Sequence, residues 1–458
     1  MMKQVWRQLV WGVVLSAWSI QSAAAAAPGI THGVASGEVT ATSALIWARA
    51  NRAATLVVEY AENVALRRSQ TAGAVRVTAK TDFTGVVAVT GLQPATRYYY
   101  RVRPAKTSVT GVIGSFVTAP LAEQSHTVTF LWGGDLGGQG FCRQPAYAIF
   151  RPMAAQVADF FLFGGDTIYA DSPCPSPPNA PGSDFVAQTQ EQFWAKYKYQ
   201  REDPGLRTLL AGTPVYAIWD DHEVKNDFAG PTQPLTPIGL QAFWDYFPFP
   251  RPAQDEHRLY RSYRWGKHLE LFILDNRQYR SPNTQADGPD KTMLGAAQRQ
   301  WLLAGLASST ATWQIIMSSV PLSTQTGSPV TGNDSWAKGA FSSGFDSELS
   351  TIVSTLQNSK KRNVVWLSTD IHVARMLSYD PDQDGAADFH EFISGPLSAI
   401  TGNLDPLDET FHPQVLYEET RFFNFGVVRI DGQSGALTAE IRDQEGKVHY
   451  ALTLPAQH

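Results

Sequence analysis

The sequence predicts a small β-sandwich followed by a larger layered α/β domain, and a change of pattern near residue 120 is the main evidence. From residue 28 to 120, apolar and polar residues alternate in short runs separated by turns, with no helical stretch between them. Beyond Ala119-Pro120, strand-like runs alternate with helical segments, which is typical of a layered α/β fold. The length of 458 residues also favours two domains, because a single core rarely exceeds roughly 250–300 residues.

Residues 1–26 have the pattern of a signal peptide. Lys3 and Arg7 precede the apolar run Leu9–Ile20. Small residues follow, and we place the cleavage site near Ala26. The apolar run is shorter than the roughly 20 residues that cross a bilayer, so we expect no stable membrane anchor. We therefore expect an exported protein, periplasmic or extracellular, that uses the general secretory route because the leader has no adjacent Arg pair.

Residues 27–120 are expected to form the β-sandwich. Three runs alternate with period two: Ser43–Arg49, Thr55–Tyr60 and Val75–Thr78. In Gly91–Val102, the pattern Leu-x-Pro-x-Thr-x-Tyr-x-Tyr resembles the corner of a fibronectin type III-like or immunoglobulin-like domain, where a tyrosine hydroxyl fixes the chain.

Residues 121–458 are expected to form the α/β domain. We expect strands at Thr127–Gly134, Phe160–Gly165, Pro214–Asp220, Gln314–Val320 and Val364–Thr369. We expect helices at Pro145–Val157, Gln190–Arg201, Leu206–Ala211, Pro237–Tyr246, Ala296–Leu306 and Glu348–Ser359. Leu259–Leu274 is predicted to be a hairpin that turns at Gly266, and Phe422–Leu454 is predicted to form further hairpins.

The composition excludes several classes of protein. With 43% hydrophobic and 17% charged residues, the chain is neither disordered nor a coiled coil. The 37 basic and 42 acidic residues give a net charge of −5, which becomes −7 once Lys3 and Arg7 leave with the leader. Because there is no basic block, we expect no nucleic-acid-binding surface.

Acidic residues and histidines directly follow four apolar strand-like runs. Ligands of open α/β sheets gather at the carboxyl ends of the strands. One such acid could be a helix cap or a turn residue, but four in one domain predict a shared metal centre. Carboxylates suit hard cations, while imidazole and phenolate add affinity for transition metals. The four segments are Phe130–Asp135, Phe161–Asp171, Ala217–Glu223 and Val365–His372.

Several segments together resemble the PhoD-like alkaline phosphatases of the metallophosphatase superfamily. The resemblance spans essentially the whole mature chain, including the small β-domain. It implies a four-layer α/β/β/α metallophosphatase domain with phosphoric ester hydrolase activity. The segments that carry it are Gly165-Asp166-x-x-Tyr169, Trp219-Asp220-Asp221-His222-Glu223, Asp370-x-His372, His32–Glu38, Leu274–Arg280 and Glu391–Pro396.

The resemblance also implies a dinuclear metal centre. Asp221 stands where the wider superfamily has Asn, Asp370 stands where it has His, and Thr369 replaces the usual Gly. This set is rich in oxygen, so we expect Fe(III) on the Tyr169 side and Ca²⁺ opposite, with Zn²⁺ or Mn²⁺ as alternatives. The implied ligands are Asp135, Asp166 as the bridging carboxylate, Tyr169 as a phenolate, Asp221, Asp370 and His372.

Two further residues are expected to act on the substrate. In this family the two metals activate a hydroxide for in-line attack at phosphorus, and His222 would protonate or hydrogen-bond the leaving oxygen. The alternative role of His222 is that of a core histidine held by Asp220. Arg277 would clamp the phosphate with its planar guanidinium group, or it would form a structural ion pair with Asp275.

The leading hypothesis is therefore a secreted, metal-dependent phosphoesterase of the PhoD type. We expect a monomer that hydrolyses small-molecule phosphomonoesters, phosphodiesters or both. The alternative is a phospholipase D-like phosphodiesterase of the same family. A catalytically inactive binding protein on the same scaffold is less favoured, because all the implied ligands are present.

A second metal signal is independent of the resemblance. Residues 380–391 fit the twelve-residue calcium-loop template, with Gly385 at its sixth position. The flanking residues look like strands, so this would be the loop alone, and a solvated acidic turn is the alternative. The loop residues at ligand positions are Asp380, Asp382, Asp384, Ala386, Asp388 and Glu391.

The two cysteines, Cys142 and Cys174, are expected to form a disulfide, because an exported protein meets an oxidising environment. The alternative is that Cys142 is a metal ligand.

Overall fold

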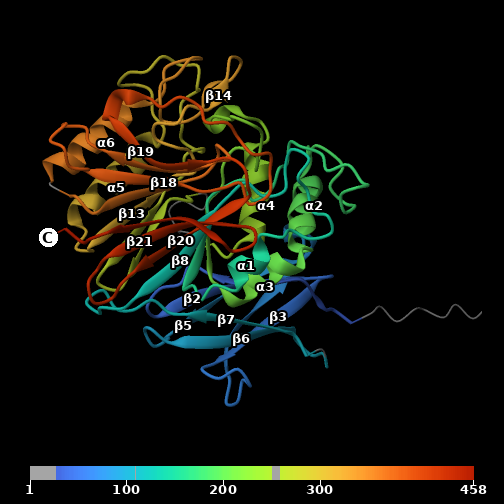
Figure 1. Ribbon diagram of the computed structural model, residues 1–458. Helices are drawn as coiled ribbons and strands as arrows, with labels where there is room; N and C mark the ends of the chain where they lie inside the picture. The colour runs from blue at the N-terminus through green and yellow to red at the C-terminus, as the bar shows by residue number, and fades with distance from the viewer. Residues whose placement is uncertain (1–26, 109, 250–257, 360, 458) are drawn as a thin grey trace, which may run out of the picture.

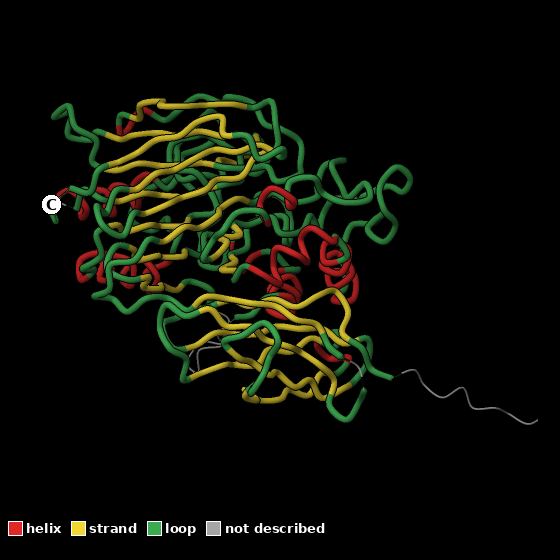
Figure 2. The backbone as a smooth tube through the Cα atoms, turned by 60° about the horizontal axis from the view of Figure 1, so that its bottom comes forward, coloured by secondary structure: helices red, strands yellow, loops and turns green. Residues whose placement is uncertain are grey.

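The computed structural model describes residues 27–108, 110–249, 258–359 and 361–457. The segment predicted to be a signal peptide lies outside these residues. The described residues form a small β-sandwich at the bottom of Figure 1, below a larger layered body, and Figure 2 shows the strands of that body side by side. None of the described helices combines the length and the apolar character that a bilayer span requires.

The N-terminal sandwich contains the first seven strands. β4 (Gln70–Val77), β3 (Ala54–Ala61), β6 (Arg97–Pro104) and β7 (Val112–Val117) form one antiparallel sheet in this order. β1 (Ile30–Gly37), β2 (Ser43–Ala50) and β5 (Thr84–Thr90) form the facing layer. The hydroxyl of Tyr98 accepts a hydrogen bond from the backbone N–H of Gln93 at 2.9 Å, which is the corner contact that the sequence pattern predicts.

The facing layer continues into the second domain as part of one nine-stranded sheet. The order is β22-β21-β20-β8-β9-β10-β1-β2-β5. The junction is the parallel pair of β1 with β10, where Gly37 lies opposite Val215. A Cβ atom at Gly37 would lie 2.3 Å from the carbonyl oxygen of Val215, so the close approach of the two strands requires glycine. The added strands are β8 (Val128–Gly133), β9 (Phe160–Phe163), β10 (Val215–Ala217), β20 (Asn424–Ile430), β21 (Leu437–Asp443) and β22 (Val448–Leu454).

A seven-stranded sheet faces the nine-stranded one. Its order is β11-β12-β13-β16-β18-β17-β19, and β12, β13, β16 and β18 are parallel. The predicted hairpin at Gly266 is confirmed as β11 and β12, with φ of +63° at this glycine. The strands are β11 (Arg261–Trp265), β12 (Leu269–Ile273), β13 (Trp313–Met317), β16 (Val364–Ser368), β17 (Ala374–Tyr379), β18 (Phe389–Ile393) and β19 (Pro413–Glu419).

Successive side chains of the central strands point to opposite faces of the seven-stranded sheet and so pack in two different cores. In β13, Ile315 and Met317 belong to the core between the sheets, whereas Ile316 packs with α5 and α6. Leu367 and Trp366 of β16 repeat this alternation. The helices α5 and α6 thus cover the outer face of the seven-stranded sheet, and the helices α1–α4 lie on the other side of the molecule (Figure 1). The α/β/β/α fold class is confirmed.

One predicted helix is shorter than expected. The segment Pro145–Val157 contains only α1, over Phe150–Ala154, because the backbone N–H of Tyr147 donates to the carboxylate of Asp203 at 2.8 Å instead of entering a helix. The other helices are α2 (Gln190–Arg201), α3 (Pro204–Gly212), α4 (Thr236–Tyr246), α5 (Gly295–Ser308) and α6 (Asp346–Asn358). The remaining elements are the pair β14 (Gly327–Ser328) and β15 (Gly332–Asn333) and three short 3₁₀ turns at Ala79–Thr81, Gly230–Thr232 and Glu409–Phe411.

Candidate metal centre

The predicted strand-end residues meet at one edge of the two sheets. β8, β9 and β10 are neighbouring parallel strands that lead to Asp135, Asp166 and Asp221. β16 of the facing sheet leads to Asp370 and His372. The backbone N–H of Asp370 donates to Oδ1 of Asp135 at 3.2 Å, so the two sheets are joined at this place.

Four of these residues have a left-handed backbone conformation. The φ angle is +65° at Asp135, +48° at Asp166, +75° at Asp370 and +57° at His372. Non-glycine residues adopt this region rarely and at an energetic cost, and such residues concentrate at functional sites. β8, β9 and β16 therefore end in abrupt turns, and the energetic cost of these turns is a first indication of a functional site.

The potential ligands form several overlapping groups, and within each the donor atoms lie within 4.8 Å of one another; two of these groups contain most of the predicted ligands. One group offers nitrogen as well as oxygen, and the hydroxyl of Tyr169 lies 2.9 Å from Nε2 of His372. The other group offers carboxylates alone. Asp166 shares a further group with Asp221 and so connects the two. The first group is Asp135, Asp166 and His372, and the second is Asp220, Asp221 and Asp370.

At this site, four buried carboxylate oxygens have no hydrogen-bond partner among the described residues. They are Oδ2 of Asp135, Oδ2 of Asp220, Oδ1 of Asp221 and Oδ2 of Asp370. Burial raises the pKa of Asp135, and the neighbouring carboxylate of Asp220 raises it further. Buried anionic oxygens without a partner are costly unless a cation compensates them. The donor set therefore fits bound cations.

His222 is held by a carboxylate that the sequence analysis did not assign. Its Nδ1 lies 2.7 Å from Oδ1 of Asp171, and its ring stacks on Tyr169 with 4.2 Å between the ring centres. The alternative of a core histidine held by Asp220 is therefore wrong. Burial alone would lower the pKa of His222, but the carboxylates of Asp221 and Asp171 raise it to about 10, which favours the protonated ring.

Arg277 is fully buried, and neither of its predicted roles is found. Its Nε donates to Oδ1 of Asp220 at 2.5 Å, and its two terminal nitrogens donate to the carboxylate of Asp334 at 2.8 and 2.6 Å. The hydrogen bond from Arg277 to the carboxylate of Asp275 comes from the backbone N–H of Arg277 and not from its guanidinium group. Because Asp220 and Asp334 occupy the buried guanidinium group, Arg277 is not placed to bind a phosphate. It is instead the counter-charge of the carboxylate groups.

A pocket of about 220 Å³ opens onto both groups of ligands. Its rim is polar and acidic, and neither Lys nor Arg is among the described residues that line it. The lining residues are Gln139, Asp221, His222, Asn226, Asp227, Thr326, Asp370, Ile371, His372, Gly402, Asn403 and Asp405.

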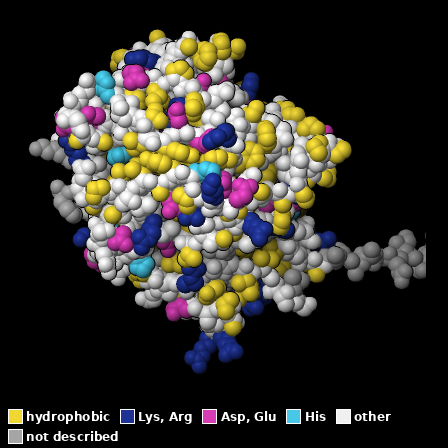
Figure 3. All heavy atoms as spheres, in the orientation of Figure 1, with side chains coloured by type: hydrophobic (Ala, Val, Ile, Leu, Met, Phe, Trp, Pro, Cys, Tyr) yellow, Lys and Arg dark blue, Asp and Glu magenta, His cyan; other side chains and the backbone are white. Residues whose placement is uncertain are grey.

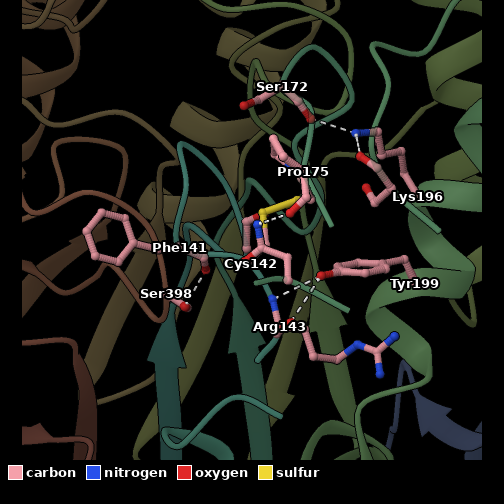
Figure 4. The surroundings of a disulfide bond; sticks show 12 residues. Phe141, Cys142, Arg143, Ser172, Pro175, Lys196, Tyr199 and Ser398 are labelled. Carbon is pink, nitrogen blue, oxygen red and sulfur yellow. Dashed lines mark hydrogen bonds between the residues drawn. A yellow bond between two sulfur atoms is a disulfide. The ribbon is translucent and has the colours of Figure 1, made fainter. Parts of the chain in front are cut away.

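Cys142 and Cys174 form a disulfide beside the site (Figure 4). Both sulfur atoms lie near the carbonyl oxygen of Gly137, at 3.4 and 3.6 Å. The next residue, Gly138, packs on the ring of Tyr169, where a Cβ atom would lie 2.2 Å from the ring. The disulfide therefore joins the loop that covers Tyr169 to the loop that follows Tyr169 in the sequence.

The structure brings together only part of the predicted calcium loop. The carboxylates of Asp380, Asp382 and Asp384 lie within 4.8 Å of one another. The backbone N–H groups of Asp384 and Gly385 donate to Asp380 at 3.1 and 3.0 Å, and that of Ala386 donates to Asp384 at 2.9 Å. The loop is thus closed by its own hydrogen bonds.

Asp388 and Glu391 have partners elsewhere, which corrects their assignment as calcium ligands. Asp388 pairs with Arg362 at 2.5 Å. Glu391 is fully buried in β18 and accepts hydrogen bonds from Ser368 at 2.8 Å and Tyr379 at 2.6 Å. Because strand β18 directs this side chain into the core, the twelve-residue template is not assembled.

The surface view in Figure 3 shows acidic, basic and apolar side chains interspersed over the face of the molecule that it presents. Basic side chains form no continuous band on this face.

Comparisons with known proteins place this geometry in a family. Residues 130–441 match the family described as PhoD-like phosphatase, and residues 16–120 match the PhoD-like phosphatase N-terminal domain. The chain belongs to the PhoD-like phosphatase family. Alkaline phosphatase D of Bacillus subtilis (strain 168) is 24% identical over an aligned length of 454 positions, and the alignment covers 86% of this chain and 73% of that protein. As a PhoD-like phosphatase, this chain is a phosphoric ester hydrolase.

Two solved structures share the fold. A structure described as that of PhoD matches with a TM-score of 0.75 at 21% identity, covering 93% of this chain and 88% of the other. The purple acid phosphatase PPD1 from yellow lupin (Lupinus luteus) seeds matches with a TM-score of 0.62 at 14% identity, covering 93% and 74%.

The site of this PhoD-like phosphatase contains residues that sequence reasoning missed. Asp171 and Asp220 lie inside the motifs that predicted the centre, so their position was a usable signal. Asp334 had no such signal, because it lies 57 residues from Arg277 and follows no strand pattern. Glu223 closes the motif that begins at Trp219, and its contacts are visible only in three dimensions.

Proposed function

We propose that this PhoD-like phosphatase is an exported, metal-dependent phosphoesterase that hydrolyses small phosphomonoesters, phosphodiesters or both. One observation carries the metal dependence: four unpartnered carboxylate oxygens are buried together at the ends of β8, β10 and β16. Arg277 reaches the other oxygen of Asp220, but no described lysine or arginine lines the pocket, either to offset these four oxygens or to bind an anionic ester. Bound cations would do both.

The donor chemistry supports two different ions. Asp135, Asp166, Tyr169 and His372 would hold Fe(III), because phenolate and imidazole favour transition metals. Burial and then the charge on His222 lower the pKa of His372 to about 4, so its ring is neutral, as a metal ligand must be. The second group, Asp220, Asp221 and Asp370, would hold a harder ion such as Ca²⁺. When bound, such ions neutralise phosphate oxygens and acidify water.

The protein's own residues would manage the proton on the leaving group. Asp171 occupies Nδ1 of His222, which leaves Nε2 to donate its proton to the leaving oxygen. The ring of Tyr169 stacks on the imidazole and restricts its rotation. Gly138 packs on the Tyr169 ring from the side of the disulfide loop and so limits its movement further.

Elemental analysis of the purified mature protein, together with its visible spectrum, tests the proposed ions. We expect iron and calcium in a fixed ratio and a tyrosinate-to-iron charge-transfer band that Tyr169→Phe removes. Zinc alone in a colourless protein would contradict the assignment of Tyr169. Asp166→Ala should lose metal and turnover together, because Asp166 belongs to groups on both sides of the site. A variant that keeps both would refute the centre.

Turnover of p-nitrophenyl phosphate and of bis(p-nitrophenyl) phosphate by the metal-loaded enzyme ranks monoester against diester hydrolysis. Absence of turnover on both, with metal bound, would favour the inactive binding protein instead.

A further inference from the structure

We propose that Glu223 is a positioning residue that fixes the two ligand-bearing loops after β9 and β10 and thereby sets the affinity of the site for cations. The inference rests on the proposed metal centre, and it assigns to this chain a determinant of that centre outside the ligands themselves.

A single carboxylate receives four hydrogen bonds. Oε1 of Glu223 accepts from the backbone N–H of Thr167 at 2.6 Å and from its hydroxyl at 2.5 Å. Oε2 accepts from the backbone N–H of Asp166 at 3.1 Å and of Asp220 at 2.8 Å. These donors fill all the acceptor positions of an ionised carboxylate, so the side chain is held in one orientation.

The four donors come from two loops that carry ligands of both groups. Asp166 and Thr167 follow β9, whereas Asp220 follows β10. The loops pack closely, because a Cβ atom at Gly165 would lie 2.6 Å from Cβ of Asp220. Glu223 therefore links Asp166, which belongs to the group with His372, to Asp220, which belongs to the group with Asp221 and Asp370.

The loop after β9 has a strained backbone, which the hydrogen bonds to Glu223 stabilise. Asp166 is left-handed, with φ of +48°, which costs free energy in a residue that has a Cβ atom. Without Glu223, the N–H groups of Asp166, Thr167 and Asp220 would lose this acceptor in the interior, and an unsatisfied buried N–H group is itself destabilising. The same loop orients the ligand further, since Oδ1 of Asp166 accepts the backbone N–H of His222 at 3.1 Å.

Glu223 does not act on the substrate directly. Its exposed fraction is 0%, and it is not among the residues that line the pocket. Its effect on turnover must therefore pass through Asp166 and Asp220. Residues that orient metal ligands in this way typically change metal affinity by about 10- to 100-fold.

The test compares Glu223→Gln with a matched control, Glu348→Gln. Glu348 is also a buried glutamate, and it accepts two backbone N–H groups and a hydroxyl, but these belong to Thr292, Met293 and Leu294 before α5, far from the ligands in the chain. In Glu223→Gln, an NH₂ group replaces one of the two oxygens and cannot accept the two hydrogen bonds which that oxygen received. Both variants should lose thermal stability.

The deciding measurement is the metal that each protein retains across an EDTA titration, read by elemental analysis. We expect Glu223→Gln to lose its metal at an EDTA concentration about 10- to 100-fold lower than the parent does. Glu348→Gln should lose its metal at the same EDTA concentration as the parent. Equal retention by Glu223→Gln and the parent overturns the inference, and so does equal loss in the two variants. If the parent itself retains no metal, the proposed function fails first, and the inference fails with it.

Should Glu223→Gln not fold, Thr167→Val and Thr167→Ser decide the question. Thr167→Val removes only the hydroxyl donor to Oε1, whereas Thr167→Ser keeps it. Weaker retention in Thr167→Val with parental retention in Thr167→Ser supports the role of Glu223. Parental retention in both contradicts it.

Discussion

Nδ1 of His222 lies 2.7 Å from Oδ1 of Asp171, and the other oxygen of Asp171 accepts the backbone N–H of Asn226 at 2.8 Å. The backbone thus orients the carboxylate of Asp171, and this carboxylate in turn orients the imidazole of His222. This pair supports the leaving-group role that we propose for His222, because an oriented ring would present only Nε2 to the substrate.

Loss of this orientation should reduce turnover most for esters with poor leaving groups. We expect Asp171→Asn to lower kcat for an alkyl phosphate ester by about 10- to 100-fold, part of the roughly 10²- to 10⁴-fold that a general acid supplies. The loss for a p-nitrophenyl ester should be smaller, because p-nitrophenolate leaves without a proton. Metal content should match the parent. Equal losses on both esters would show that His222 does not protonate the leaving oxygen.

Arg277 should prove to be a structural counter-charge. The guanidinium group of Arg277 binds Asp220 and Asp334 together, and the single ammonium group of Arg277→Lys cannot do so. Complete loss of a partner of a buried ion pair costs about 3–5 kcal/mol, and this is the upper limit for the substitution. We therefore expect a clear fall in Tm with KM for the phosphate ester unchanged. A raised KM with an unchanged Tm would restore the phosphate-clamp hypothesis. Circular dichroism melting and steady-state kinetics on the same preparations give both readings.

The strand-end acids are predictable from sequence, and the network behind them is not. Parallel strands bring their carboxyl ends to one sheet edge, so Asp135 and Asp166 can be placed together from local patterns alone. The role of Arg277 depends on Asp334, 57 residues away in a segment without regular periodicity. The same distinction explains the calcium loop: its spacing is local, but Glu391 belongs to the core through Tyr379 and Ser368.

The fold follows the same rule. Alternation and helical periodicity predict the layers, because they report which face of each element is buried. The continuity of the nine-stranded sheet depends on one pair, Gly37 opposite Val215, and no periodic pattern announces a single close contact. Domains that are separate in pattern can therefore share a sheet in space.

The disulfide should stabilise both the fold and the surroundings of Tyr169. Replacing Cys142 and Cys174 together by serine removes a link between residues 32 apart in the chain, worth about 3–4 kcal/mol on the chain-entropy account. We expect a lower Tm and, because Gly138 packs on the Tyr169 ring, a shifted or weaker visible band in the metal-loaded protein. A lower Tm with an unchanged band would confine the disulfide to a structural role.

The contact between the sandwich and the hydrolase body should make stability depend on acid pH. Asp82 of the sandwich binds Arg49 at 2.9 and 3.1 Å and accepts the hydroxyl of Tyr246 from α4. Burial alone would raise the pKa of Asp82, but the hydrogen bonds from Arg49 and Tyr246 hold it below the ordinary value of 3.8. A carboxylate with a lowered pKa in the folded state contributes stability above its unfolded pKa and loses it as pH falls through the folded value.

We therefore expect Tm of the parent to fall below about pH 4 more steeply than Tm of Asp82→Asn, which lacks the titrating group. At pH 7 the variant should be the less stable of the two, since an amide at this position leaves Arg49 without its carboxylate partner. Melting curves from pH 7 to pH 3 check both statements. Parallel curves for the two proteins across this range would mean that the carboxylate of Asp82 contributes no acid-dependent stability.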